Sequence, residues 1–477
     1  MTTVIAAGAS GPAKLRAVTQ LMEKVQSGLE NQTVSQTELE ASLEQLKLYG
    51  RDPKDADPIF TQDGIKSLAR LAFESRSRTV ARGALRVLAN SMLLKPNTRQ
   101  IVVDLAFPGI ACKQLCEEGP KDWDDSFLLA RVLLLVTYAQ LDLSTVIEEN
   151  DMAGAIAANL NRHVEVMDKR ESSEPAHPMQ DMALNETLRL LFNVTHLSPT
   201  QASLFTSSVP HIVSLLWKQE IPSNRPLDPP FSPLINALLN LDLRAEQVRP
   251  SLFPDSPNKA PARVAERLIR LLELSLETKE YTETYLEQNL PPLIGVLQAL
   301  HSAANDEVKK HLRTRLLPQE EDRKEVLGRG ASLGSKLLRN SNSPMTPQLG
   351  EVISNLLFEF SDKDATKFVD NVGFGYASGF LAKHNIATPE NVASTSNSTT
   401  SRPVNPVTGQ FLDEESTPDM PPMTEEEKLR EAERLFVLFE RLKQTGIMDV
   451  QNPVEQAMRS GRFHELGEDR VTEVDSD

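Results

Sequence analysis

Side chains that could bind a ligand recur on one face of several predicted helices. Arg189, Asn193 and His196 follow one another at intervals of four and three residues, which places them on one side of a helix. An Asn amide both donates and accepts hydrogen bonds, and an Arg guanidinium can hold a carboxylate with two parallel hydrogen bonds. For any single helix, a solvated surface is the simpler interpretation. The arrangement recurs, however, and the resulting candidates are Arg86, Asn90, Arg189, Asn193, His196 and Asn240, with Arg82 and Asn236 on the same faces.

Motifs for covalent chemistry are weak. Residues 328–336 resemble a phosphate-binding loop, but the Lys does not directly follow the second glycine of a correctly spaced pair, and no apolar strand precedes it. Residues 373–379 have one residue too many for a dinucleotide fingerprint and are predicted to form a turn between helices. Cys112 and Cys116 have no nearby His or Cys partner for a metal and are interpreted as buried small hydrophobic residues. We therefore expect no enzyme activity, no cofactor and no metal site.

One short repeated pattern predicts how the polar faces are positioned. It begins with an apolar residue and a basic or amide residue, and it occurs as LKLYGR, LRVLAN, LRLLFN and INALLN, with a degenerate copy, ARVLLL. The copies end at Arg51, Asn90, Leu135, Asn193 and Asn240, which gives steps of 39, 45, 58 and 47 residues in chain order. These steps bracket the roughly 40–47 residues of armadillo and HEAT repeats. The sequence therefore predicts an all-α, armadillo/HEAT-like superhelix with one insertion.

The predicted solenoid covers residues 1–385, although the pattern decays after Asn240. Stacked repeats would align the polar faces into a ladder along one side of the superhelix. Apolar periodicity predicts further helices at 263–276, 293–301, 349–360 and 376–383.

The composition changes after the predicted solenoid. Residues 386–423 are rich in Ser, Thr, Asn and Pro and are interpreted as a flexible linker. Residues 424–445 predict an amphipathic helix whose apolar face carries Leu435, Leu438 and Phe439, and residues 446–477 form an acidic tail. An amphipathic helix on a tether suggests docking to a partner.

Composition and charge limit the function classes. The chain has 51 Lys and Arg residues against 67 Asp and Glu residues, so its formal charge of −16 disfavours nucleic acid as a partner. No segment approaches the roughly 18 apolar residues needed to span a membrane, and the first residues lack the basic flank of a signal peptide. Two cysteines are too few for a disulfide framework in a chain of this length. We expect a cytoplasmic protein without direct membrane insertion.

Three stretches together resemble the synembryn family of non-receptor exchange factors for heterotrimeric G-protein α subunits. They are ALNETLRLLFNVT at 183–195, VGFGYASGFLAKHNI at 372–386, and NPVTGQFLDEESTPDMPPMTEEEKLREAERLFVLFERL at 405–442. The last is the most specific, because it combines an Asn-Pro-x-Thr-Gly entry, a Pro/Met spacer and a Met-Thr-Glu-Glu helix start. LKLYGRD at 46–52 and ALRVLAN at 84–90 extend the resemblance towards the N-terminus.

The resemblance implies a repeat superhelix whose concave face holds the C-terminal helix of an α subunit, while the tail helix clasps the GTPase core. Withdrawal of that C-terminal helix would release GDP, and the same grip would chaperone newly made α subunits. The groove contacts that it implies are Lys47, Arg51, Asn90, Phe192 and Asn193, and His196 stands where the family leads us to expect an aromatic anchor. The protein would be cytoplasmic and peripheral at the membrane through the α subunit.

A second interpretation of the same residues is a generic armadillo-type scaffold, which binds an extended peptide through its Asn ladder and has no exchange activity. Binding to purified α subunits distinguishes the two interpretations.

Overall fold

The computed structural model describes residues 10–30, 34–117, 122–139, 143–169, 177–255, 260–388, 402–405 and 407–415, with isolated positions between 424 and 434. The chain divides into two compact units, Met1–Asp413 and Glu414–Asp477. Within the described part of the first unit, the regular structure is helical apart from one isolated antiparallel bridge between Val404 and Phe411. The prediction of an all-α helical-repeat fold is confirmed.

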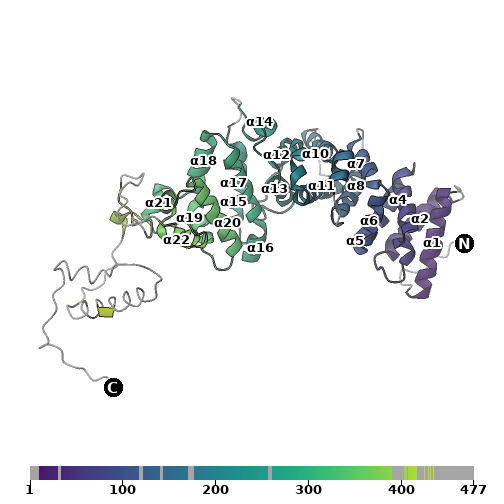
Figure 1. Ribbon diagram of the computed structural model, residues 1–477, viewed down its shortest axis with the longest axis horizontal. Helices are drawn as coiled ribbons and strands as arrows, with labels where there is room; N and C mark the ends of the chain where they lie inside the picture. Colours follow the sequence, from purple (N-terminus) through teal and green to yellow (C-terminus); the bar gives the residue numbers. More distant parts are fainter. Residues whose placement is uncertain are drawn as a thin grey trace, which may run out of the picture. The chain divides into compact units, whose positions relative to one another are not determined.

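The helices follow one another along the first unit (Figure 1). The earlier helices are α1 Pro12–Glu30, α2 Gln36–Tyr49, α3 Asp57–Phe60, α4 Gln62–Glu74, α5 Arg78–Leu94, α6 Asn97–Asp104, α7 Phe107–Cys116, α8 Trp123–Thr137, α9 Ser144–Glu149, α10 Met152–Lys169, α11 Pro178–Leu197, α12 Val209–Lys218 and α13 Phe231–Leu239. The later helices are α14 Arg249–Leu252, α15 Arg263–Glu277, α16 Glu283–Asn289, α17 Pro291–Ala303, α18 Asp306–Leu316, α19 Leu333–Ser341, α20 Pro347–Phe360, α21 Ala365–Val372 and α22 Phe374–Lys383. Short 3-10 helices are η1 Pro199–Ser208, η2 Glu246–Val248, η3 Glu320–Lys324 and η4 Leu412–Glu414.

Two parallel series of helices run through this unit. The repeated sequence pattern lies on, or ends just after, α2, α5, α8, α11 and α13, and each of these helices packs against the next. The series continues through α17 and α20, beyond the point where the sequence pattern decays. A second series, α1, α4, α7, α10, α12, α15 and α18, packs in the same sequential way. This arrangement, in which each helix contacts its neighbours along the chain, is that of a repeat solenoid.

Apolar burial and N-terminal caps explain why these segments are helical. In α11 Leu184, Leu188 and Leu191 form an apolar stripe that is buried between the helix layers, and each fully buried leucine contributes about 1.5–3 kcal/mol. Helix α2 begins with a capping box in which Ser35 and Glu38 satisfy each other's backbone amides. The caps fix where such helices begin, and burial of the apolar residues determines which face each helix turns outward.

Two local expectations can be compared with the structure. The prediction of a turn over residues 373–379 is wrong for most of this stretch: only Gly373, with φ of 81°, lies between α21 and α22, and the residues after it belong to α22. Cys112 is fully buried, and this burial raises the pKa of its thiol to about 12. The interpretation of Cys116 as buried is wrong: this residue is exposed, because it is the last residue of α7.

The predicted linker at 386–423 contains a packed segment. Residues 402–405 and 407–413 fold back onto η3 and α22 through backbone hydrogen bonds, and Phe411 is only 3% exposed. A flexible linker is therefore the wrong description of this part. Residues 389–401 and 416–423 lie outside the described residues, as do nearly all of 424–445 and all of 446–477.

Candidate functional site

Two adjacent cavities lie along the first helix series. The first has a volume of about 850 Å³ and is lined by residues of α2, α5, α8 and α11. The second, of about 480 Å³, is lined mainly by α8, α11, α13 and α16. Leu93, Arg131 and Arg189 line both cavities, so the two form one continuous groove.

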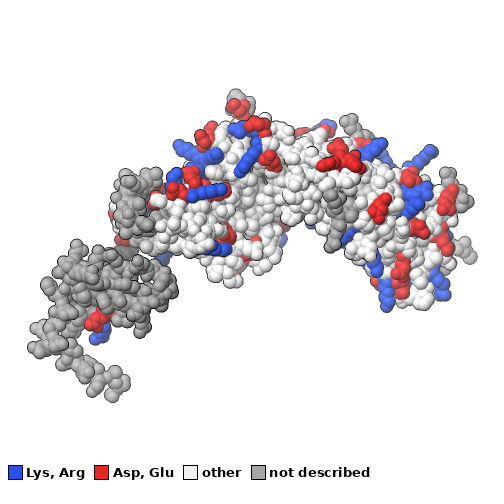
Figure 2. Space-filling view, in the orientation of Figure 1, with Lys and Arg blue, Asp and Glu red and all other residues white. Residues whose placement is uncertain are grey.

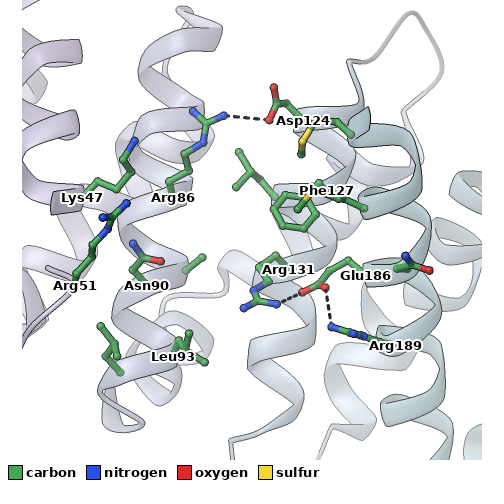
Figure 3. Close-up of a pocket in the computed structure, with 16 residues that line it drawn as sticks. Lys47, Arg51, Arg86, Asn90, Leu93, Asp124, Phe127, Arg131, Glu186 and Arg189 are labelled. Atoms are coloured by element: carbon green, nitrogen blue, oxygen red, sulfur yellow. Dashed lines mark hydrogen bonds and ion pairs between the residues drawn. The ribbon is translucent and has the colours of Figure 1, made fainter. Parts of the chain in front are cut away.

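Most of the predicted contact residues in the solenoid lie in this groove. Figure 3 shows Lys47, Arg51, Arg86 and Asn90 on one side of the first cavity and Phe127, Arg131, Glu186 and Arg189 on the other. Phe192, Asn193 and Asn236 line the second cavity.

The remaining predicted residues lie elsewhere. His196 is exposed and stacks on Phe192 at 5.6 Å between ring centroids, but it lines neither cavity, and Asn240 is also absent from both linings. Leu435, Leu438 and Phe439 lie outside the described residues. The part of each predicted residue in binding stays a prediction.

Ion pairs join α5 to α8, and residues of both helices line the first cavity. The side chain of Asp122 caps α8, and Asp122, Asp124 and Asp125 place three carboxylates at the start of this helix. Arg82 of α5 pairs with Asp122 at 2.9 Å and with Asp125 at 2.6 Å, and its hydrogen bonds to Asp125 raise the pKa of its guanidinium. Arg86, one turn further along, pairs with Asp124 at 3.1 Å. The cations of α5 therefore stabilise the α5–α8 contact beside the cavity.

On the opposite wall of the first cavity, basic side chains lie around one buried carboxylate, that of Glu186. Glu186 of α11 has a side chain only 4% exposed and accepts a hydrogen bond of 2.6 Å from Arg131 of α8. Arg189 approaches the other oxygen of Glu186 at 3.9 Å. A buried carboxylate needs such partners, because an unpaired one would carry a large desolvation cost. This pairing holds Arg131 at the junction of the two cavities, and Arg189 lies beside it.

The amides of the predicted Asn ladder are used in two different ways. Asn193 donates to Thr137 Oγ1 at 3.2 Å, and Asn240 donates to the carbonyl oxygen of Phe192 at 3.4 Å. These amides tie neighbouring helices together. Arg51 and Asn90, by contrast, have no side-chain partner among the described residues. Their donors and acceptors therefore remain open to a ligand in the first cavity.

Exposed apolar side chains border the same groove. Leu93 and Met182 are each 48% exposed, and Tyr138 is 53% exposed. Leu93 lines both cavities, Met182 the first and Tyr138 the second. Apolar anchors surrounded by polar groups are typical of protein interaction surfaces. The groove thus offers both apolar contacts and directed hydrogen bonds.

Sequence reasoning missed several lining residues. Arg131 could have been found, because it holds the same place in ARVLLL as Arg86 holds in LRVLAN and Arg189 in LRLLFN. Phe127, Met182, Tyr285 and Asn289 carry no such signal. The last two reach the second cavity from α16, which lies outside the repeated pattern.

Two other kinds of site find no support among the described residues. They contain no cluster of three or more His, Cys, Asp or Glu side chains that could hold a metal ion. No helix among them is both long and apolar enough to cross a bilayer. On the face drawn in Figure 2, basic side chains are interspersed with acidic ones and form no single continuous basic area.

Comparison with known proteins finds similarity over most of the chain. A synembryn-like chaperone of Schizosaccharomyces pombe is 29% identical over 309 residues, which cover 61% of this chain and 57% of that relative. Chaperone Ric-8A of Gallus gallus is 24% identical over 87% of this chain and 85% of its own length. Chaperone Ric-8A of Bos taurus is 22% identical over 85% and 81%, respectively. The family model described as guanine nucleotide exchange factor synembryn matches residues 42–462, and the chain therefore belongs to the synembryn family.

Proposed function

We propose that this protein binds heterotrimeric G-protein α subunits, promotes the release of their GDP, and acts as a chaperone for newly made α subunits, without any covalent step. Family membership supports the exchange and chaperone activities, since the family model carries the description of an exchange factor and several relatives are named chaperones. The identity of the partner is carried over from the resemblance seen in the sequence.

The observation that carries the proposal is that the first cavity combines polar side chains without a partner among the described residues and an exposed apolar side chain. In the first cavity, Arg51 and Asn90 lie close to the exposed side chain of Leu93 in the same lining. An amphipathic helix that ends in a free carboxylate would satisfy this combination, because its carboxylate accepts from the guanidinium and its apolar face covers the leucine. The C-terminal helix of an α subunit, which the family resemblance implies as the ligand, would present its free carboxylate in this way.

The proposed exchange activity needs only a difference in binding. If the groove holds the C-terminal helix in a position withdrawn from the nucleotide site, the protein binds the nucleotide-free α subunit more tightly than the GDP-bound form. Linkage then requires reciprocity: the factor by which the protein weakens nucleotide binding equals the factor by which nucleotide weakens the complex. A ligand with equal affinity for both states would shift nothing.

The test is GDP release from a purified α subunit, followed with and without the protein, together with size-exclusion chromatography of the complex. We expect faster GDP release, and we expect excess GTP with magnesium to dissociate the complex. The isolated protein should bind neither GDP nor GTP. A complex that survives GTP unchanged would support the scaffold without exchange activity. Tight nucleotide binding by the protein alone would instead direct attention to the glycine-rich segment at 328–336.

A further inference from the structure

The described residues of the segment NPVTGQF, Asn405 and 407–411, lie in a compact turn. Residues 402–405 and 407–413 form an antiparallel hairpin with a bridge between Val404 and Phe411, and we name this segment the return hairpin. The Asn405 amide donates to the Gln410 carbonyl at 2.8 Å, and the Gly409 amide donates to the Asn405 carbonyl at 2.8 Å. Gly409 has φ of 68°, which a residue with a side chain rarely adopts. Asn405 Oδ1 also accepts from the amides of Val407 at 2.9 Å and Thr408 at 3.3 Å, so the Asn and Gly of the motif have structural roles in this turn.

Backbone hydrogen bonds attach the return hairpin to two separate parts of the solenoid end. The Leu327 amide donates to the Thr408 carbonyl at 3.1 Å, and the Gly375 amide donates to the Val407 carbonyl at 3.1 Å. The Phe411 amide donates to the carbonyl of Arg323 at 2.9 Å. Because these bonds come from both the η3 region and α22, the return hairpin is held on more than one side.

The side chain of Arg323 completes the attachment. It is 7% exposed, and burial lowers the pKa of its guanidinium. Its Nη1 donates to the Gly409 carbonyl at 3.0 Å, while its Nη2 donates to the carbonyls of Asp370 at 2.6 Å and Asn371 at 3.3 Å. One buried cation thus joins the return hairpin to the end of α21.

We propose that the return hairpin is an anchor that fixes where the C-terminal segment starts, so that the segment reaches a partner held in the groove over a short tether. This inference rests on the proposed function, because the partner in question is the α subunit and the reaching element is the predicted amphipathic helix at 424–445. The return hairpin and Arg323 act as positioning elements and need not touch the α subunit.

The expected gain follows from tether length. Without the attachment, the predicted linker would run over the 38 residues 386–423, whereas from the anchored Asp413 only the 10 residues 414–423 remain. Effective concentration falls roughly as the −3/2 power of tether length once the tether can span the distance, so anchoring raises it by about sevenfold. The same factor applies to the affinity for an intact α subunit. It does not apply to an isolated C-terminal peptide, which uses the groove alone.

The test compares one insertion placed on either side of the anchor in the full chain. A Gly/Ser segment of about 20 residues between Glu415 and Ser416 lengthens the tether and should weaken binding of the intact α subunit by about fivefold. The same segment between Ala393 and Ser394 precedes the anchor and should leave the affinity unchanged. Calorimetry with the isolated C-terminal peptide of the partner serves as the control for the groove, and we expect all variants to bind it equally.

A second variant releases the anchor. In Gly409→Val, the added Cβ would lie 2.3 Å from Leu327 Cδ1 on a backbone that already disfavours side chains. We expect this variant to bind the intact α subunit about sevenfold more weakly. Adding either insertion to it should lower the affinity by only about a further twofold, because the tether is already long. Gly379→Ala is the matched control, since its added methyl group meets no atom within 4 Å.

The outcomes separate this inference from the proposed function. Equal effects of the two insertions in the chain with the native hairpin, together with normal peptide binding, would overturn the anchor and leave the proposed function standing. A chain that binds neither the peptide nor the intact α subunit would overturn both.

Discussion

In the groove, Arg51 is exposed just after α2 and has no side-chain partner among the described residues, whereas at the return hairpin Arg323 is buried and donates to three carbonyl oxygens. Both residues carry a guanidinium group. The hydrogen-bond donors of Arg323 are paired, whereas those of Arg51 are not paired within the described residues. The partners of Arg323 are backbone groups of the same chain, so its hydrogen bonds form on folding. Those of Arg51 can form only when a ligand enters the cavity.

This difference indicates how to divide the polar residues of a repeat protein into structural and binding groups. A buried donor that is fully paired stabilises the fold, and its loss exposes unpaired acceptors. An exposed donor without a partner contributes little to stability but can contribute strongly to binding. Substitutions at the two arginines should therefore separate stability from affinity.

The largest effect is expected from Arg323→Ala. Loss of the guanidinium leaves the carbonyls of Gly409, Asp370 and Asn371 without this donor, at a cost of about 3 kcal/mol to the attachment of the return hairpin. Native-state hydrogen exchange measures this directly, because the amides of Leu327 and Phe411 bond across the attachment. Their protection should fall on the order of 100-fold.

Two controls sharpen this result. Arg323→Lys keeps the charge but loses the planar fork, so it should show an intermediate loss of protection. Amides in the middle of α5 should be unaffected, because this helix lies far from the return hairpin in the packing order of the solenoid. An equal loss of protection in α5 would mean that Arg323 supports the whole unit rather than the return hairpin.

The next effect is expected from Arg51→Ala and concerns affinity rather than stability. A charged hydrogen bond to a carboxylate is worth about 1.5–3 kcal/mol, so the C-terminal peptide of the partner should bind about 10- to 100-fold more weakly. The free energy of unfolding should change by less than about 0.5 kcal/mol. Arg16 of α1 is also exposed, and Arg16→Ala is the matched control for loss of one surface charge. If both variants bind the peptide equally, the first cavity is not the carboxylate site.

The difference between the repeat helices and the return hairpin explains which parts of the fold the sequence could predict. The repeat helices were predictable because burial of Leu184, Leu188 and similar residues imposes a helical period on the sequence. Much of the first cavity followed, since Arg86, Asn90 and Arg189 hold fixed places in the repeated pattern.

The return hairpin was not predictable from the same signals. Its attachment depends chiefly on backbone hydrogen bonds and on the single buried Arg323, which leave almost no mark on apolar periodicity. Its polar composition favoured a linker instead. The second cavity was only partly predictable, because Tyr285 and Asn289 come from α16, far along the chain from α8 and α11.

The smallest expected effect separates two asparagines of one ladder. Asn90 has no side-chain partner among the described residues, so Asn90→Ala should leave stability unchanged and weaken peptide binding by about fivefold, the value of one neutral hydrogen bond of about 1 kcal/mol. Asn193 already donates to Thr137, so Asn193→Ala should reverse the pattern and lower the free energy of unfolding by about 1 kcal/mol. Denaturant unfolding and calorimetry on the same two variants give both quantities. Asn90→Asp tests the charge of the group bound in the first cavity. A carboxylate beside Arg51 would repel the carboxylate of the peptide, so this substitution should weaken binding more than Asn90→Ala does. Tighter binding by Asn90→Asp would show that the group held in the first cavity is not an anion.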